Sequence, residues 1–179
     1  MPRYSQLLHL LQGAGAGGSA PDYETDVIPY LVDVWLDEYV AAGGSDLDVV
    51  QVSTGGFEYL FDVAAERLLA AWGVSQGKHT GARPASRMAG HPLGAGAGYH
   101  RGHAVPHTLG GGTDINLVPQ LGSVNVGAFR PLEIQAVGTP GALYFTHWSY
   151  ADATSQKPAA VEQGLIRPGL PPDIRTHAN

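Results

Sequence analysis

Groups able to carry out acid–base and metal chemistry are concentrated in one stretch of the chain, residues 99–133. The stretch contains three histidines, two arginines, two asparagines and a glutamate, and these side chains stand among glycines. A neutral imidazole can take a proton from water near pH 7, while amide and carboxylate oxygens are ligands that Mg²⁺ accepts. The residue types of this stretch therefore predict an active site.

Two strands, a glycine loop and a helix are expected to position these groups. Residues 99–103 and 115–120 have the composition of strands, and the glycine loop 108–114 lies between them. A helix is predicted from about residue 128 to 137, because Pro131 then falls in the first turn, where a missing N–H donor is tolerated. The predicted order of elements is strand, loop, strand, helix.

This order suits the hydrolysis of phosphodiesters. It can bring His103 from the first strand opposite Asn125 and Glu133 near the start of the helix. Mg²⁺ held by such oxygen ligands keeps most of its waters and stabilises charge on a leaving oxygen. Arg101 lies two residues before His103, on the same face of the strand, where a guanidinium can hold a phosphate by charge-assisted hydrogen bonds.

Three short blocks in the stretch resemble a known family. The blocks are Arg101-Gly102-His103, then Asn116-Leu117-Val118-Pro119-Gln120, then Asn125-Val126-Gly127-Ala128-Phe129-Arg130-Pro131-Leu132-Glu133. In order and spacing they resemble the DNA/RNA non-specific endonucleases of the ββα-metal (His-Me finger) superfamily. The family pattern is Asp-Arg-Gly-His, Asn-hydrophobic-x-Pro-Gln and Asn-x-Gly-x-aromatic-x-x-Leu-Glu. The resemblance covers residues 99–133, extends loosely to the strands after residue 142 and says nothing about residues 1–74.

The resemblance implies the catalytic roles at four positions. It implies His103 as the general base and Asn125 as the direct protein ligand of Mg²⁺ or Mn²⁺. It implies Glu133 as a group that orders metal-bound water, and Arg101 as a phosphate contact. The cofactor and the catalytic residues are thus expectations that follow from the resemblance.

Four further positions are expected to support the site or to bind substrate, and they are His100, Asn116, Gln120 and Arg130. His100 departs from the family, because it stands where the pattern has an aspartate. The positioning that the aspartate provides is therefore missing, and a histidine there would instead add positive charge toward DNA.

The histidines also allow a zinc site as a second interpretation. His103 and His107 are four residues apart, a spacing that brings two zinc ligands together on a helix, and His100 would be a third ligand. Gly102 and Pro106 oppose a helix at this place, so the zinc interpretation is the less favoured one.

Composition limits the chemistry of the whole chain. The 179 residues carry a net charge of −6 and no cysteine, which excludes disulfides, thiolate ligands and a cysteine nucleophile. Residues 1–74 hold two basic and eleven acidic side chains, a net charge of −9. Residues 75–179 hold eight basic and five acidic ones, a net charge of +3, and seven of the eight histidines. The first half would repel phosphate groups and the second would attract them.

The first half is predicted to be mainly helical. Apolar residues at helical spacing indicate helices at residues 3–12, 26–42 and 57–72. A β-branched run at 47–53 predicts one strand, and the glycine and alanine residues at 13–19 predict a flexible linker.

The second half is predicted to have long loops and a few strands. Residues 75–98 are polar, basic and glycine-rich, which indicates a long loop suited to contact with a polyanion. Alternating residues predict a strand at 142–150, with residues 159–167 as its hairpin partner. The proline-rich residues 168–179 are expected to run over the surface.

The predicted fold class is α+β: an acidic helical region, residues 1–74, followed by a ββα-metal nuclease domain with a small antiparallel sheet, residues 75–179. The expected function is metal-dependent endonuclease activity on DNA or RNA. Two alternatives stay open: the nuclease module of a secreted antibacterial toxin that has a carrier and a neutralising immunity protein, or a nucleic-acid binder that keeps the fold without cleavage.

No membrane partner is expected. The apolar run from Leu7 to Leu11 is interrupted by His9, so it is too short and too polar for a secretory signal. No run approaches the roughly 18 apolar residues of a membrane span. We therefore expect a soluble protein, either cytoplasmic or exported by a specialised secretion system.

Overall fold

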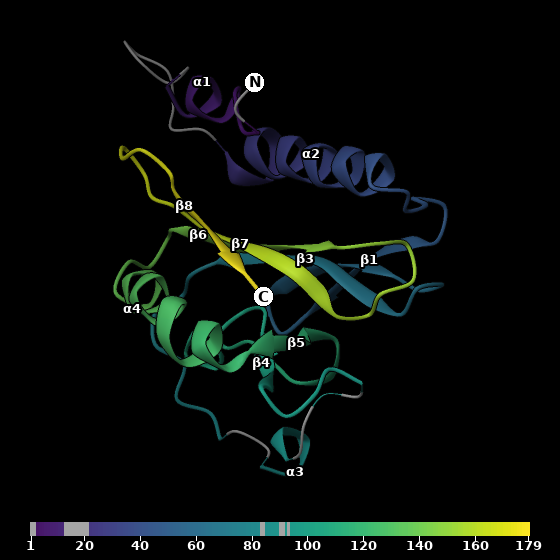
Figure 1. Ribbon diagram of the computed structural model, residues 1–179. Helices are drawn as coiled ribbons and strands as arrows, with labels where there is room; N and C mark the ends of the chain where they lie inside the picture. The colour runs from purple at the N-terminus through teal and green to yellow at the C-terminus, as the bar shows by residue number, and fades with distance from the viewer. Residues whose placement is uncertain (1–2, 13–21, 83–84, 90–91, 93) are drawn as a thin grey trace.

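Runs of β-branched and aromatic residues form a central sheet in the computed structural model, which describes residues 3–12, 22–82, 85–89, 92 and 94–179. Its strands are β1 (Val49–Thr54), β2 (Phe57–Asp62), β3 (Arg67–Val74), β6 (Leu143–Tyr150), β7 (Pro158–Ile166) and β8 (Asp173–Ala178). They form a six-stranded sheet in the order β1-β2-β3-β6-β7-β8 (Figure 1). Every neighbouring pair is antiparallel.

A second sheet has two antiparallel strands, β4 (Tyr99–His103) and β5 (Leu117–Leu121). The short helical turns around it are η2 (His107–Leu109), η3 (Asp114–Asn116) and η4 (Val124–Ala128), and the last of these leads into α4 (Arg130–Val137). The other helical segments are α1 (Leu7–Gln12), η1 (Tyr23–Val27), α2 (Ile28–Ala41) and α3 (Ala85–Met88).

The central sheet is covered on both faces (Figure 1). Helices α1 and α2 lie over one face, and α4 with the β4–β5 hairpin lies over the other. On the first face Trp35 packs against Trp72 and Phe145, with ring centroids 5.5 and 5.4 Å apart. On the second face Phe129 packs against Trp148 at 6.1 Å. Burial of these aromatic side chains holds the three layers together.

The helix predicted for residues 57–72 is wrong, because this segment forms β2, a turn and β3. All residues of β3 except the last are buried, since the sheet is covered on both faces. A strand buried on both faces has a continuous apolar run instead of an alternating one, and such a run also fits a helical pattern. Residues 1–74 are therefore acidic, as predicted, but only partly helical.

The sheet joins the two halves of the chain. Strand β3, from the first half, pairs with β6, from the second, and Trp72 stands opposite Phe145. Residues 1–74 and 75–179 thus contribute strands to one sheet, and α4 packs against strand β7 of it. The candidate site is positioned by an architecture to which both halves contribute.

The surface course predicted for residues 168–179 is confirmed, since none of these residues is buried, but residues 173–178 also form an edge strand that was not predicted, β8, which pairs with β7. The next residue, Asn179, connects three segments through its side chain. Its Oδ1 accepts a hydrogen bond from the N–H of Leu121 at 2.8 Å, and its Nδ2 donates to the carbonyls of Pro119 and Pro158 at 2.9 and 3.0 Å. Asn179 therefore fastens β5 to the central sheet.

Most of the other predicted elements are confirmed, as is the α+β class. The helices at 26–42 and 128–137 and the strands at 47–53, 99–103, 115–120, 142–150 and 159–167 are present within a few residues of their predicted bounds. The linker predicted at residues 13–19 lies outside the described residues. None of the helices in the described part of the chain is long and apolar enough to cross a bilayer.

A buried polar network ties the start of the chain to the central sheet. Arg3 donates from Nη2 to Nδ1 of His147 at 2.7 Å and pairs with Glu162 at 2.9 Å. The His147 ring stacks on Trp35 with an interplanar angle of 5°. Burial and, to a lesser extent, the Arg3 charge lower the pKa of His147 well below its usual value. Although Glu162 lies 4.0 Å from Nδ1, the burial and the hydrogen bond accepted from Arg3 keep the ring neutral.

We expect this neutral histidine to make stability depend on pH. In the unfolded chain a histidine binds a proton below about pH 6.5, whereas folded His147 does not, so stability is lost as pH falls through that value. The loss approaches about 1.4 kcal/mol per pH unit for this residue alone. Urea unfolding at several pH values between about 7.5 and 5 measures it.

The substitution His147→Gln keeps an acceptor for Arg3 and removes the titration, so its stability should fall less steeply with decreasing pH. His9→Gln, at an exposed position on α1, is the matched control and should keep the steep slope. Equal slopes for the two variants would contradict the prediction.

Candidate active site

The β4–β5 hairpin carries most of the predicted site residues, and one glycine sets how closely its side chains pack. The register places His100 opposite Gln120 and His103 opposite Leu117. A Cβ atom at Gly102 would lie 2.1 Å from Oε1 of Gln120. Only glycine fits between Arg101, the predicted phosphate contact, and His103, the predicted base, because the Gln120 side chain lies against the backbone of Gly102.

The loop that follows His103 is held by Asn116, which is fully buried. Its Oδ1 accepts a hydrogen bond from the N–H of Val105 at 2.7 Å. Its Nδ2 donates to the carbonyls of Val105 and Gly112, both at 2.9 Å. The side chain therefore uses its acceptor and both of its donors to tie Val105, before the glycine loop, to Gly112, within it, a contact that fits the support role predicted for Asn116.

His103 is the last residue of β4 and is 7% exposed. Its ring centroid lies 6.1 Å from that of His107, which in turn lies 5.5 Å from that of His79. The backbone N–H of His79 bonds to the carbonyl of Thr108 at 2.8 Å, so the segment after β3 folds over this loop. The predicted base thus lies in a group of three imidazoles.

Sequence reasoning did not find this group. His79 precedes His103 by 24 positions and stands in a predicted long loop, so no periodic pattern connects the two. The ring of His107 is oriented by its Nε2, which lies 3.1 Å from the carbonyl oxygen of Gly81. Because a carbonyl only accepts, this ring nitrogen carries the proton. Only the basic composition of residues 75–98 pointed to this loop.

Arg101 lies on the same face of β4 as His103, since the two are separated by one residue. Its Nη1 donates to the carbonyl of Arg87 at 3.1 Å, and it lines a groove of about 290 Å³ together with Arg87, Asp114 and Pro119. Arg87 pairs with Asp114 at 3.2 Å, and both side chains are largely exposed. The groove therefore presents two guanidinium groups beside the hairpin.

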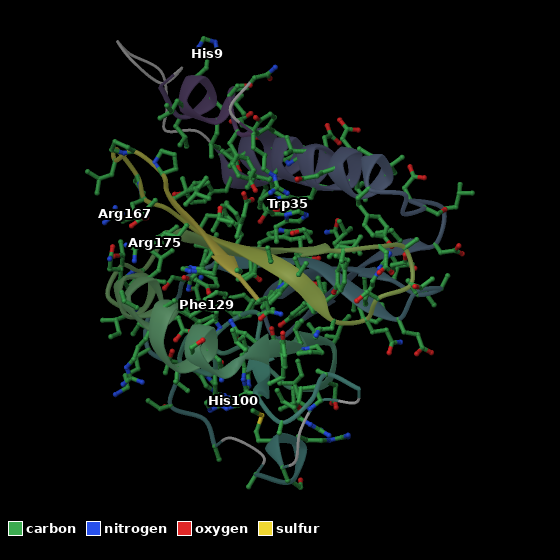
Figure 2. All side chains as sticks on the ribbon, viewed as in Figure 1. His9, Trp35, His100, Phe129, Arg167 and Arg175 are labelled. Atoms are coloured by element: carbon green, nitrogen blue, oxygen red, sulfur yellow. The ribbon has the colours of Figure 1, made fainter. Side chains whose placement is uncertain are left out.

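Asn125 meets the hairpin at His100, which Figure 2 labels below α4. Asn125 Nδ2 lies 3.2 Å from Nδ1 of His100. Because an amide nitrogen only donates, this ring nitrogen is unprotonated and accepts. A Cβ atom at Gly122 would lie 3.0 Å from the other ring nitrogen, so Gly122 leaves room for the imidazole. His100 thus contacts the predicted metal ligand.

Three other predicted site residues lie in the first turn of α4 and on β5. Glu133, in the first turn, is half-buried; burial first and the Glu133 charge second raise the pKa of Tyr144 well above its usual value. Arg130 is exposed. Gln120 is fully buried, and within the described residues neither atom of its amide has a hydrogen-bond partner. Its polar capacity is therefore available to a water molecule or a ligand.

The three histidines of the zinc interpretation do not converge. His100 and His103 lie on opposite faces of β4 by strand alternation, and His100 contacts Asn125. Across the described ranges, no three His, Asp or Glu side chains form a group that could hold a metal ion. A hydrated Mg²⁺ ion needs no such group, because it keeps several waters and takes one or two protein ligands. The proximity of Asn125 to His103 stays a prediction.

No protein-family model matches this chain, and no curated protein matches it. The roles of the site residues therefore rest on the contacts above and on the resemblance of the three sequence blocks.

We expect Asn116→Asp to destabilise the fold. The new carboxylate would face the two carbonyl oxygens of Val105 and Gly112 in place of an N–H donor, and an unsatisfied buried polar group costs about 1–3 kcal/mol. Urea unfolding measures the loss. Gln6→Glu, the same change from an amide to a carboxylate at an exposed position, is the matched control and should change stability by less than about 0.5 kcal/mol. A wild-type urea midpoint for Asn116→Asp would contradict the stabilising role of these hydrogen bonds.

Proposed function

We propose that the protein is an Mg²⁺-dependent endonuclease that hydrolyses phosphodiester bonds of DNA or RNA. The observation that carries the proposal is the order of elements β4, β5, η4 and α4, because all three sequence blocks lie on this one unit. The His, Asn and Glu residues that the chemistry needs come from different elements of the unit. A chance likeness of one block would not place all three blocks, in order, on one strand–strand–helix unit.

The general base in this proposal is His103. Its side chain is nearly buried at the end of β4. The hydrogen bonds between the Asn116 side chain and Val105 hold the backbone that follows His103. A neutral imidazole in such a fixed position can remove the proton from a water molecule as the water attacks phosphorus. The ring of His107 lies next to it, followed by that of His79, and both rings can add hydrogen-bond donors.

Arg101 is proposed to hold the phosphate under attack. It lies on the face of β4 that also carries His103 and lines the groove next to Arg87. A guanidinium can form two parallel hydrogen bonds with phosphate oxygens. The exposed ion pair of Arg87 with Asp114 can exchange the carboxylate for a substrate phosphate at little cost, because exposed pairs contribute about 0–1 kcal/mol.

The residues present fit a hydrated Mg²⁺ ion. Asn125 gives its Nδ2 to His100, which leaves Oδ1 as a hard oxygen ligand. The buried amide of Gln120, opposite His100 in the hairpin, has both polar atoms available, and Glu133 is proposed to orient bound water. When bound, the ion would stabilise negative charge on the transferred phosphate and on the leaving oxygen.

His100 is proposed to hold the Asn125 amide in this orientation. We expect His100→Ala to weaken Mn²⁺ binding about tenfold, because groups that orient metal ligands are worth about 10–100-fold in affinity. His100→Asp, which restores an acceptor, should bind within about threefold of wild type on the same grounds. Electron paramagnetic resonance of free Mn²⁺ measures both without any substrate. If His100→Ala binds Mn²⁺ with wild-type affinity while Asn125→Ala loses binding, His100 does not orient the Asn125 amide.

We expect the purified protein to cleave plasmid DNA or RNA with Mg²⁺ and to lose the activity in EDTA. The substitution His103→Ala should lower the rate by about 10²–10⁴-fold, since that is the contribution of a general base. His9→Ala, at the exposed position on α1, is the control and should cleave at the wild-type rate. Undiminished cleavage by His103→Ala, or in EDTA, would refute the proposal.

A further inference from the structure

Strand β1 forms an open edge of the central sheet. Among the strands that the structure describes, it pairs with β2 alone. Its residues, Val49–Thr54, include no charged side chain and no proline. Proteins usually protect such an edge with charges, prolines or bulges. The opposite edge follows that rule, because β8 carries Asp173, Arg175 and His177, the first two as an ion pair at 2.7 Å.

Exposed aliphatic side chains gather at the start of β1. Leu47 is 90% exposed, Val50 41% and Val63 55%. The N–H of Val63 bonds to the carbonyl of Asp48 at 3.0 Å, which brings the end of β2 beside the residue before β1. An uncharged backbone edge next to exposed aliphatic side chains can accept a further strand, with side-chain contacts adding to the backbone hydrogen bonds.

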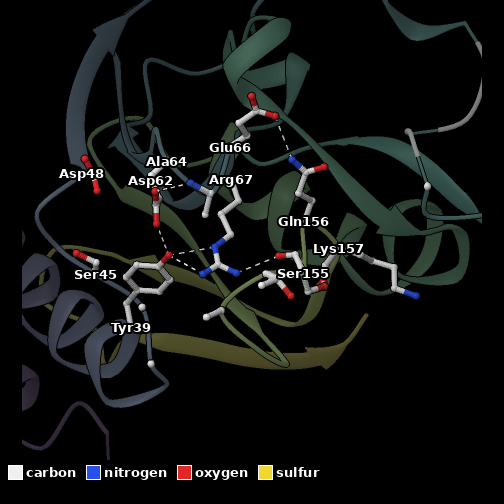
Figure 3. A pocket seen from close by; sticks show the side chains of 16 residues that line it. Tyr39, Ser45, Asp48, Asp62, Ala64, Glu66, Arg67, Ser155, Gln156 and Lys157 are labelled. Atoms are coloured by element: carbon white, nitrogen blue, oxygen red, sulfur yellow. Dashed lines mark hydrogen bonds between the residues drawn. The ribbon is translucent and has the colours of Figure 1, made fainter.

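The surroundings of this edge are acidic. Between Arg3 and Arg67 the chain has eleven acidic residues and no lysine or arginine. Asp46 and Asp48 stand exposed just before the strand. Asp48 also borders a hollow of about 780 Å³, which Figure 3 shows from close by. A strand that pairs here would therefore meet negative charge at the Val49 end.

Both basic side chains of the hollow have partners within the protein, and Figure 3 shows the contacts of Arg67 with Tyr39 and Ser155. Arg67 donates from Nε and Nη2 to Oη of Tyr39 at 3.0 and 2.6 Å. Its Nη1 donates to the carbonyls of Asp152 and Ser155 at 2.9 and 3.0 Å. Lys157 lies over the ring of Tyr99 at 4.8 Å. The lining of the hollow has three carboxylates, Asp48, Asp62 and Glu66, against these two cations, so its net charge is negative.

We infer that β1 is the docking site for another protein, which adds an extended segment carrying lysine or arginine as a seventh strand. The negative surroundings exclude nucleic acid as the occupant, because phosphate would be repelled. They also oppose pairing with a second copy, which would bring together two N-terminal halves of net charge −9 each. Backbone pairing gives affinity, and charge selects a basic partner.

The partner strand would end beside the candidate active site. At the other end of β1, a Cβ atom at Gly55 would lie 3.8 Å from the carbonyl oxygen of Gly110, in the loop after His103. The docked strand therefore borders the loop that holds the predicted base. The inference itself rests on the sheet edge and its charge, and it holds whether or not the protein cleaves nucleic acid.

The test uses the full chain and three synthetic peptides: one in which lysine alternates with valine, one with glutamate in place of lysine, and the lysine peptide N-methylated at every residue. Fluorescence anisotropy measures binding, and amide chemical shifts locate it. We expect the lysine peptide to bind at least about tenfold more tightly than the glutamate peptide at low salt. Its shifts should centre on Val49–Thr54, and N-methylation, which removes backbone donors but no charge, should abolish binding.

A charge-reversed variant and its matched control complete the test. Asp46→Lys with Asp48→Lys should weaken binding of the lysine peptide about threefold to tenfold. Asp33→Lys with Asp37→Lys, at exposed positions on α2, should leave it unchanged. Equal binding of the N-methylated peptide, shifts centred away from β1, or a dimer in sedimentation whose amide shifts on dilution centre on Val49–Thr54 would each overturn the inference.

Discussion

Burial of both faces of the central sheet is the constraint on which the rest of the structure depends. Strands β3 and β6 lie in its middle, and their side chains reach into both core clusters. Trp72 and Phe145 are covered by the N-terminal helices, and Trp148 by the layer that carries the candidate site. Burying one large apolar side chain contributes about 1.5–3 kcal/mol, so neither layer is dispensable. The candidate site thus takes its place from apolar contacts made by residues that have no part in its chemistry.

Hydrogen bonds then fix the position of the β4–β5 hairpin and α4 on the sheet. Oγ1 of Thr146, on β6, donates to the carbonyl of Ala104 at 3.3 Å, one residue after the predicted base. Nε2 of Gln163, on β7, donates to the carbonyl of Phe129 at 3.1 Å, where α4 begins. Apolar packing alone tolerates small shifts, whereas an unpaired buried polar group costs about 1–3 kcal/mol. These two bonds therefore tie the residues next to β4 and α4 to neighbouring strands of the central sheet.

The sequence predicted the local elements of the site and missed the contacts between them. The hairpin, the glycine loop and the helix with Pro131 in its first turn follow from spacing and turn residues, and all of them are present. The helix predicted at 57–72 failed because burial on both faces removes the alternation that identifies a strand. Strand β8 was missed because an edge strand with charged residues lacks an apolar pattern. The His100–Asn125 contact and the group around His107 join distant positions, which periodicity cannot detect.

The side chain of Asn179 has a consequence for the order in which the molecule is made. It fastens β5 to the central sheet, yet it is added 76 positions after His103. Strands β6 and β7, which the hairpin layer needs as its support, are also translated after α4. A nascent chain that has completed the three sequence blocks therefore still lacks the surface on which they assemble. The candidate site can therefore assemble completely only after strands β6 to β8 and Asn179 have been translated.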